Sequence, residues 1–398
     1  MDFYLRRAAR RMTIVPNRFA KGGEAEIYGI PGRGDQSVKV YPDKTRPTDL
    51  EPRLEHMIDH PPPTIVDRLA WPLDLVEDDR GAVVGYLQPW FGSPYVTLAQ
   101  ALDTVQPPAW VTAAELHRIA CEIALLLAEL HMADYLYPDI HPGQFLCAAG
   151  QPTVAIDMAA CHFEVAGEVF TCQRARDEYQ PPELLAANDR IAAIDQRDSH
   201  GDDWSLAVVL FQITMGCLPF QGTHTGSGSD PTLIERIVQG IFPFDKNCRR
   251  FRPPPAASSY RDVMPELCDL FHACFVDGHA AQHRSSRPTA GQWTDALRHC
   301  AALRAVSVVP SSPPPVSPTL SPDRRPVLVT AGCVAAVALA AAAFQLGRWQ
   351  ASAHNQPGVF NGHDHRSSSS DGRSLGDTPS AETILDRYRH PSPLKPRR

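Results

Sequence analysis

The chain has 398 residues, 43% of them hydrophobic and 21% charged, which is an ordinary globular composition with room for a two-lobed fold and further segments. Its formal net charge of −7 argues against a nucleic-acid partner, because such binding normally needs a basic face. The ten cysteines include no CxxC pair, which argues against a zinc ribbon or a thioredoxin-like site and favours reduced, buried thiols in a cytosolic environment.

The first ninety residues predict strands, and the residues after Gly92 predict helices. We expect strands within Phe19–Ile30 and Ser37–Tyr41, and a hairpin formed by LDLV and AVVGYLQ on either side of EDDRG. One helix is expected between these strands, roughly from residue 49 to 59. The later helices are the amphipathic Ala113–Met132 and the apolar Trp204–Met215. The pattern predicts an α+β fold with a small β-rich lobe followed by a larger helical lobe.

Three segments of different character follow residue 305. Residues 306–325 are rich in proline and serine and predict an extended linker. Residues 326–347 (PVLVTAGCVAAVALAAAAFQLG) carry no charge, and as a helix of about 1.5 Å rise per residue they would span about 33 Å, enough to cross a bilayer. Residues 348–398 are polar and biased in composition, which is typical of a disordered tail.

Two elements of the β-rich region have the chemistry of phosphate binding. Gly22 and Gly23, in KGGEAEIY, would let backbone amides approach phosphate oxygens, although glycine pairs also serve as simple turns. Lys39, in SVKVY, would add a positive charge from an adjoining strand. An inward-facing Lys39 needs an ionic partner, which Glu51 or Glu55 would supply from the helix, whereas an outward-facing one would be solvated.

A second group of polar residues follows the long helix. The loop LYPDIHPGQFL places Asp139 five residues before Gln144, and Asp157 ends an apolar run in TVAIDMAAC. If both carboxylates face one cleft, one would deprotonate a hydroxyl and the other, with Gln144, would hold a divalent metal through oxygen ligands. Metal bridging of phosphates is a requirement of phosphoryl transfer.

These residues resemble the signature set of protein kinases in order and spacing. Three later segments belong to the same resemblance, namely YQPPEL (179–184), DDWSLAVVLFQITMGCLPF (202–220) and RPTAGQW (287–293). The chain is similar to a divergent branch of bacterial eukaryotic-type (Hanks-type) Ser/Thr protein kinases over roughly residues 13–300. The composition, rich in alanine, arginine and proline, also indicates a bacterial source. The resemblance implies a bilobal kinase-like fold that uses ATP with Mg²⁺ or Mn²⁺.

The resemblance also assigns roles to residues of this chain. Lys39 would hold the α and β phosphates, with Glu51, or alternatively Glu55, as its partner on the helix. Asp139 would be the catalytic base, and Asp157 with Gln144 would hold the metal. The hinge that receives adenine would contain Leu87, Gln88 and Trp90, and the phosphate loop would contain Gly22 and Gly23. Glu183 would form a structural pair with Arg287, and Asp202 would brace the catalytic loop.

Several positions depart from the kinase pattern. Gln144 stands where the family has asparagine, Met158-Ala159 where it has Phe-Gly, and His141 where it has a catalytic-loop lysine. Tyr137-Pro138 replaces the His-Arg pair before Asp139, and Ala20 and Ala25 replace the outer glycines of the phosphate loop. These changes keep an alternative open, a pseudokinase that binds nucleotide or a partner and signals as a scaffold. The YQPPEL segment disfavours a small-molecule phosphotransferase.

The expected domain organisation therefore has six parts. They are an N-terminal extension (1–12), the N-lobe (13–91), the C-lobe (92–305), the linker (306–325), one transmembrane helix (326–347) and the tail (348–398). The arginines that flank the apolar segment predict a single-pass protein of the inner (cytoplasmic) membrane, with the kinase domain in the cytoplasm and the tail across the membrane. Protein substrates are the expected partners, and self-association is left open.

Overall fold

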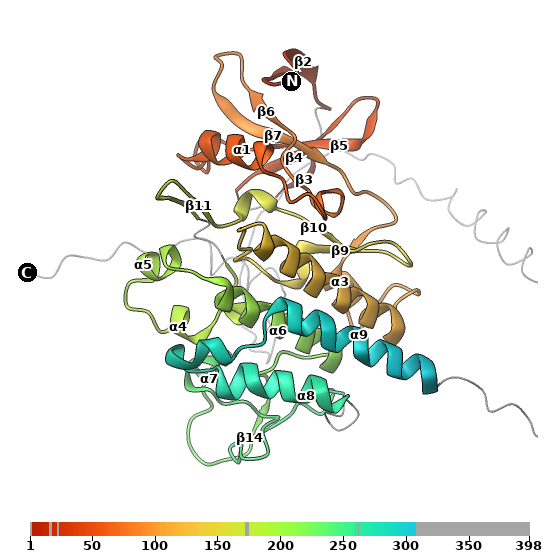
Figure 1. Cartoon of the computed structure of the whole chain (residues 1–398), viewed down its shortest axis with the longest axis vertical. Coiled ribbons are helices and arrows are strands. Elements are labelled where there is room, and N and C mark those ends of the chain that lie inside the picture. The colour runs from red at the N-terminus through yellow and green to blue at the C-terminus, as the bar shows by residue number, and fades with distance from the viewer. Residues whose placement is uncertain are drawn as a thin grey trace, which may run out of the picture. The chain divides into compact units, whose positions relative to one another are not determined.

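The computed structural model describes residues 2–15, 18–21, 24–171, 175–258, 260 and 263–307, which belong to one compact unit, Met1–Ser312. In this unit a β-sheet lies at the top of the view and most of the helices lie below it (Figure 1). Gly22, Gly23, the predicted membrane span and the predicted tail lie outside the described residues, as does the linker beyond residue 307. Within the described ranges, no helix is long and apolar enough to cross a bilayer.

Seven antiparallel strands form the main sheet, in the order β2-β1-β6-β7-β5-β4-β3. In chain order the strands are β1 (Asp2–Leu5), β2 (Arg10–Thr13), β3 (Arg18–Lys21), β4 (Glu26–Ile30), β5 (Arg33–Val40), β6 (Asp74–Glu77) and β7 (Val83–Pro89). The β6–β7 hairpin confirms the predicted one. The predicted run from residue 19 to 30 is divided into β3 and β4.

The N-terminal residues differ from the prediction. Residues 2–13 form the β1–β2 hairpin, and β1 pairs with β6, so the sheet begins before the predicted lobe boundary at residue 13. Burial alternates along β1, where Phe3 and Leu5 are buried and their neighbours are exposed. These two side chains join Val38, Val76 and other apolar residues in a cluster on one face of the sheet. Packing against this cluster explains why so short a strand is held in place.

Helix α1 (Leu50–Asp59) packs against strands β6 and β7. Its buried positions follow the helical period, with Leu50, Arg53, Leu54 and Met57 on one face. The charged member of this set, Arg53, is important for the site described below.

The helical part is built around α3 (Ala113–Met132), α6 (Ser199–Met215) and α9 (Ala290–Ser307). Helix α3 has the predicted bounds and begins after Thr112, whose side chain accepts a hydrogen bond from the Glu115 amide. Helix α6 starts five residues before the predicted position, is buried on nearly all sides and ends at Gly216, where φ is +72°. Helix α9 lies along α3. The α+β architecture with a β-rich first part and a helical second part fits a kinase-like fold.

Shorter elements connect these helices and the sheet. The helical ones are η1 (Val66–Arg68), α2 (Leu98–Ala101), η2 (Pro142–Gln144), η3 (Met158–Ala160), η4 (Asp177–Tyr179), α4 (Pro182–Leu185), α5 (Arg190–Asp195), α7 (Leu233–Gln239), α8 (Pro265–His272), the π-helical turn η6 (Ala273–Asp277) and η7 (Ala281–Ser286). The short strands are β8 (Val96–Thr97), β9 (Phe145–Cys147), β10 (Val154–Ala155), β11 (Phe163–Val165), β12 (Glu168–Phe170), β13 (Thr223–His224) and β14 (Phe251–Arg252).

Candidate active site

A cleft of about 720 Å³ is lined by residues of the sheet on one side and by the segments around η2 and η3 on the other. It brings together most of the predicted site residues, namely Lys39, Gln88, Trp90, Asp139, Gln144 and Asp157. These residues are separated by up to 118 positions in the sequence, so the fold, and not local sequence, brings them to one place.

The cation of this cleft is Lys39, which strand β5 places opposite Tyr86 of β7. Its Nζ forms an ion pair with Asp157 and lies 5.4 Å and 5.8 Å from the ring centroids of Tyr41 and Tyr86. Burial by itself lowers the pKa of Lys39, but the Asp157 carboxylate and the two tyrosines raise it, and the resulting pKa is well above the usual value. Lys39 therefore stays positively charged throughout the physiological range.

The predicted partners of Lys39 on helix α1 require a correction. Glu51 and Glu55 both bind Arg6, whose Nη1 donates to their Oε1 atoms at 2.6 Å and 2.9 Å. The two glutamates are adjacent on the helix surface, on a stripe rotated away from the buried face of α1. Asp157 takes the place that the prediction gave to Glu51 or Glu55.

A second correction concerns Leu87, which does not line the cleft. Its side chain is buried among Val38, Val76 and other apolar residues on the opposite face of the sheet. Side chains alternate along a strand, so the next residue, Gln88, faces the cleft, where its Nε2 donates to Ser37 Oγ at 3.3 Å.

The loop around η2 fixes the orientation of Asp139. Gln144 Nε2 donates to Asp139 Oδ2 at 2.9 Å, whereas Asp139 Oδ1 is buried and has no hydrogen-bond partner among the described residues. His141 Nδ1 accepts from the Gly143 amide at 2.9 Å, which leaves Nε2 as the position for the ring proton of the neutral imidazole, 3.6 Å from Asp139 Oδ2. One carboxylate oxygen is thus held by Gln144, and the other is enclosed without a hydrogen-bond partner among the described residues.

Two buried polar groups support this loop. Asp202, in the first turns of α6, accepts from the Tyr137 amide at 2.6 Å and contacts His131 Nε2 at 3.1 Å, which confirms that it braces the loop. Arg287 binds Glu183 through both Nη atoms, each at 2.8 Å, which confirms the predicted pair. Both interactions hold the helical part that carries the loop.

Asp157 has an uncommon backbone conformation. Its φ of 61° and ψ of 38° lie in the left-handed region, directly before the η3 turn. Such a conformation costs roughly 1 kcal/mol for a residue other than glycine and is enriched at functional sites. It turns the chain so that the Asp157 carboxylate meets Lys39 while Met158 is fully buried.

The cleft also contains residues that the sequence did not identify. Glu24, Phe91 and Arg176 line it, and a Cβ at Gly143 would lie 3.9 Å from Arg176 Nη2, so this guanidinium lies beside the Asp139 loop. Arg176 follows Asp157 by nineteen residues and has no motif around it that would mark it. A signal did exist for Arg53, because it is a charged residue within the apolar stripe of α1.

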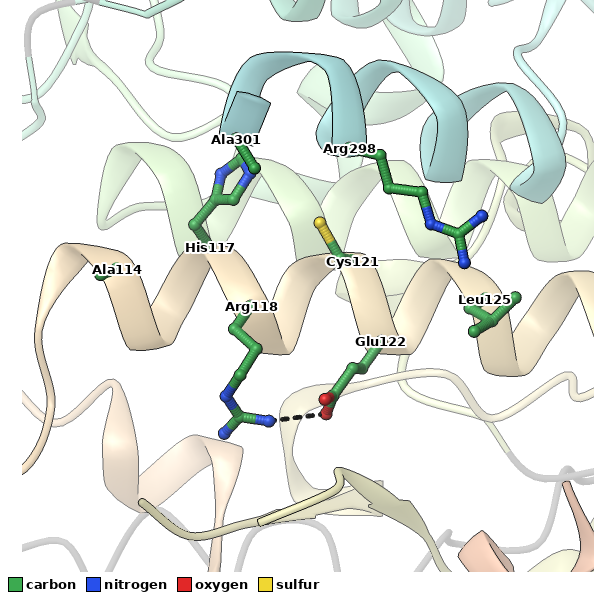
Figure 2. Close-up of a pocket in the computed structure, with 8 residues that line it drawn as sticks. All are labelled: Ala114, His117, Arg118, Cys121, Glu122, Leu125, Arg298 and Ala301. Carbon is green, nitrogen blue, oxygen red and sulfur yellow. Dashed lines mark ion pairs between the residues drawn. The ribbon is translucent and has the colours of Figure 1, made fainter. Parts of the chain in front are cut away.

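A second hollow, of about 420 Å³, lies between α3 and α9 (Figure 2). Arg118 and Glu122 project from α3 and form an ion pair at 2.8 Å, and His117 Nε2 contacts the Leu297 carbonyl of α9 at 2.8 Å. Burial raises the pKa of the Cys121 thiol in this hollow to about 11, so it is protonated near neutral pH. His117 joins α3 to α9, whereas Arg118 and Glu122 point away from α9 and bind residues 148–153 between β9 and β10.

No family model matches the chain. It is 26% identical over 154 residues to serine/threonine-protein kinase STK11 of Homo sapiens, a match that covers 38% of this chain and 33% of that protein. Against serine/threonine-protein kinase STK11 of Gallus gallus the identity is 25% over 170 residues, with 42% and 35% covered. Against MAP kinase-activated protein kinase 2 of Drosophila melanogaster it is 29% over 133 residues, with 33% and 36% covered. The matches span about a third of the length of these curated relatives.

The fold and these similarities support a protein-kinase-like family for this chain. The relatives to which it is similar carry the names of protein kinases, two of them of serine/threonine-protein kinases.

Proposed function

We propose that this chain is a membrane-anchored protein kinase that transfers the γ-phosphate of ATP to serine or threonine hydroxyls of proteins. The observation that carries the proposal is the meeting of Lys39, Asp139, Gln144 and Asp157 in one cleft. The similarity to Ser/Thr protein kinases supports the choice of reaction.

The side chains of the cleft suit a nucleotide bound with a divalent metal. Asp157 and the amide oxygen of Gln144 are the hard oxygen ligands that Mg²⁺ and Mn²⁺ prefer, and a bound metal would neutralise charge on the phosphates. Gln88 and Trp90 line the sheet side of the cleft, where the adenine would be received. The glycine pair at residues 22–23 is the proposed cover of the phosphates.

Four residues of the cleft have separate roles in the proposed transfer. The Asp139 carboxylate accepts the proton of the substrate hydroxyl as the hydroxyl oxygen bonds to the γ-phosphorus. The bond from this phosphorus to the β-phosphate oxygen then breaks and releases ADP. Gln144 keeps Asp139 in place by its hydrogen bond to Oδ2. Lys39 neutralises the α and β phosphates, and Arg176 is placed to neutralise the transferring group beside the Asp139 loop.

Transfer of labelled γ-phosphate by the full-length protein, with Mg²⁺ or Mn²⁺, tests this proposal. We expect incorporation into protein that is abolished in D139A and retained in D79A, which removes an exposed carboxylate of the β6–β7 turn. Incorporation that persists in D139A would assign the activity to another base or to a contaminant.

The alternative is a pseudokinase that binds nucleotide or a protein partner as a signalling scaffold. It is favoured by the Gln144 amide nitrogen facing Asp139 and by the pairing of Lys39 with Asp157, because both interactions engage groups that catalysis needs. Thermal stabilisation by ATP without any phosphate transfer would select this alternative.

We further propose a single membrane span at residues 326–347, with the kinase region on the cytoplasmic side of the inner membrane, where ATP is available, and residues 348–398 on the other side. The uncharged run of 22 residues supports the span, and the flanking arginines support its orientation. Protease protection of a C-terminal tag in sealed vesicles tests both the span and its orientation. Cleavage of this tag by a protease that reaches only the cytoplasmic face would reject the orientation.

A further inference from the structure

Arg53 is the buried cation of helix α1, with 3% of its surface exposed. All five of its guanidinium N–H donors have acceptors. Nε and Nη2 bind Asp49 Oδ2 at 3.2 Å and 2.7 Å, and Nη2 also donates to the Thr171 carbonyl at 2.9 Å. Nη1 donates to the carbonyls of Ala159 and Cys161 at 3.2 Å and 2.9 Å. A buried charge is tolerated only when it is satisfied in this way.

The three carbonyl acceptors, of Ala159, Cys161 and Thr171, lie on the segment that follows Asp157. Ala159 belongs to the η3 turn, in which the Ala160 amide donates to the Asp157 carbonyl and the Cys161 amide donates to the Met158 carbonyl, each at 3.0 Å. Arg53 thus holds a turn whose first backbone bond begins at Asp157 itself. The left-handed backbone of Asp157 needs such support, because an uncommon conformation persists only where its surroundings fix it.

The aromatic hairpin β11–β12 completes the enclosure of Arg53. Phe163 and Phe170 stack with ring centroids 5.0 Å apart, and the guanidinium carbon lies 5.9 Å and 5.7 Å from their rings. Arg53 is therefore bound to the chain at three places after Asp157, which are the η3 turn, this hairpin and Thr171.

We propose that Arg53 is the positioning residue that couples helix α1 to the metal-holding carboxylate of Asp157. Lys39 makes no contact with the carboxylates of α1, since Glu51 and Glu55 bind Arg6. The link between α1 and the cleft runs instead through Arg53, the η3 turn and Asp157. A displacement of α1 would move the Asp157 backbone and weaken the site for a divalent metal. The inference rests on the proposed function, because it takes Asp157 as a metal ligand.

The test compares two arginines that make similar contacts in the full-length protein, the buried Arg53 and the partly buried Arg236. Arg236 of α7 donates to the carbonyls of Pro231, Phe220 and Gly222, pairs with Asp230, and lies 4.8 Å from the Phe251 ring centroid. It makes the same kinds of contact as Arg53, and neither arginine lines the cleft, but the carbonyls that Arg236 binds lie at residues 220–231 and not on the segment after Asp157. R236M is therefore the matched control for R53M.

The first readout is the affinity for ATP, titrated with and without Mg²⁺. We expect R53M to bind Mg²⁺ about 10- to 100-fold more weakly in the presence of ATP, as is usual when the support of a metal ligand is lost, while metal-free ATP binding changes little. R236M should keep the metal dependence of the unmodified protein. Equal losses in both variants, or no loss in R53M, would overturn the inference.

The second readout needs no nucleotide and separates this inference from the proposed function. We expect hydrogen exchange at the Ala160 and Cys161 amides to accelerate in R53M and not in R236M. R53K keeps the charge but offers three donors, so in both readouts it should lie between R53M and the unmodified protein. R53K also takes the place of R53M as the test variant if R53M does not fold. Unmodified protein that shows no metal-dependent ATP binding would reject the proposed function, whereas unchanged exchange in both Arg53 variants would reject the role of Arg53.

Discussion

Replacement of the buried Asp203 by asparagine should remove a pH-dependent loss of stability. Asp203 lies in the first turns of α6 and is 1% exposed. Its Oδ1 accepts from the Ala290 amide at 3.0 Å, whereas Oδ2 is buried and has no hydrogen-bond partner among the described residues. Burial raises the pKa of this carboxyl from 3.8 to about 7, with His131 opposing and Asp202 adding to the effect.

The sign follows from proton uptake by the two states. Between pH 3.8 and about 7 the folded protein holds a proton on Asp203 that the unfolded chain has lost, so the free energy of unfolding falls as pH rises. The slope is at most about 1.4 kcal/mol per pH unit, and the whole interval corresponds to about 4 kcal/mol. D203N mimics the protonated acid, keeps an oxygen for the Ala290 amide and should remove this slope.

Urea unfolding of the full-length protein at pH 5, 6, 7 and 8, followed by tryptophan fluorescence, measures the effect. The buried Trp204 next to the substitution is a suitable reporter. We expect the difference in free energy of unfolding between D203N and the unmodified protein to increase by about 2–4 kcal/mol from pH 5 to pH 8, in favour of D203N. For D79N, at an exposed turn, this difference should not change with pH. Parallel pH profiles for D203N and the unmodified protein would refute the assignment of the slope to Asp203.

A residual slope above pH 6.5 should remain in D203N because of His131. Burial alone lowers the pKa of this imidazole, but its hydrogen bond to the Asp202 carboxylate raises it, and the resulting pKa is above 6.5. The folded state is stabilised while His131 is protonated, so this contribution is present below pH 6.5 and is lost as pH rises through the raised value. H131Q should flatten that remaining part.

Three further changes test the cleft and its supports. Q144A removes both the hydrogen bond to Asp139 and a metal oxygen, so we expect about 10- to 100-fold weaker Mg²⁺ activation of phosphate transfer; unchanged activation would exclude Gln144 as a ligand. R176A should lower the transfer rate about 100-fold with little change in the KM for ATP, and H141K, introduced with it, should restore part of the rate if a cation at this place is what matters. R6M breaks partly exposed ion pairs to α1 and β6 and should lower the melting temperature by about 2 °C; a fall above about 10 °C would assign Arg6 a larger role than ion pairing.

The sequence predicted the elements whose residues repeat at short range. The β6–β7 hairpin, helix α3 and helix α6 were predictable because their apolar periods are regular and long enough to be distinguished. The meeting of Lys39, Asp139 and Asp157 was predictable only through the resemblance to kinases, because residues so far apart in the chain have no local relation.

The failures share a cause, which is that long-range partners decide the direction of a side chain. Nothing near Glu51 shows that Arg6, forty-five residues earlier, will bind it. Leu87 was misplaced because strand alternation gives two faces and the sequence does not say which one meets the cleft. Arg53 had a visible signal, since a charge within an apolar helical stripe requires buried acceptors, but apart from Asp49 its acceptors lie more than a hundred residues away.

The ion pair between Lys39 and Asp157 has a thermodynamic consequence for the proposed ligands. Each side chain now acts as the counter-ion of the other. A phosphate group that takes Lys39 sets Asp157 free for a metal, and a metal that takes Asp157 sets Lys39 free for phosphate. By reciprocity, each ligand raises the affinity for the other by the same factor. The site would therefore bind free metal or metal-free nucleotide weakly and bind the two together strongly.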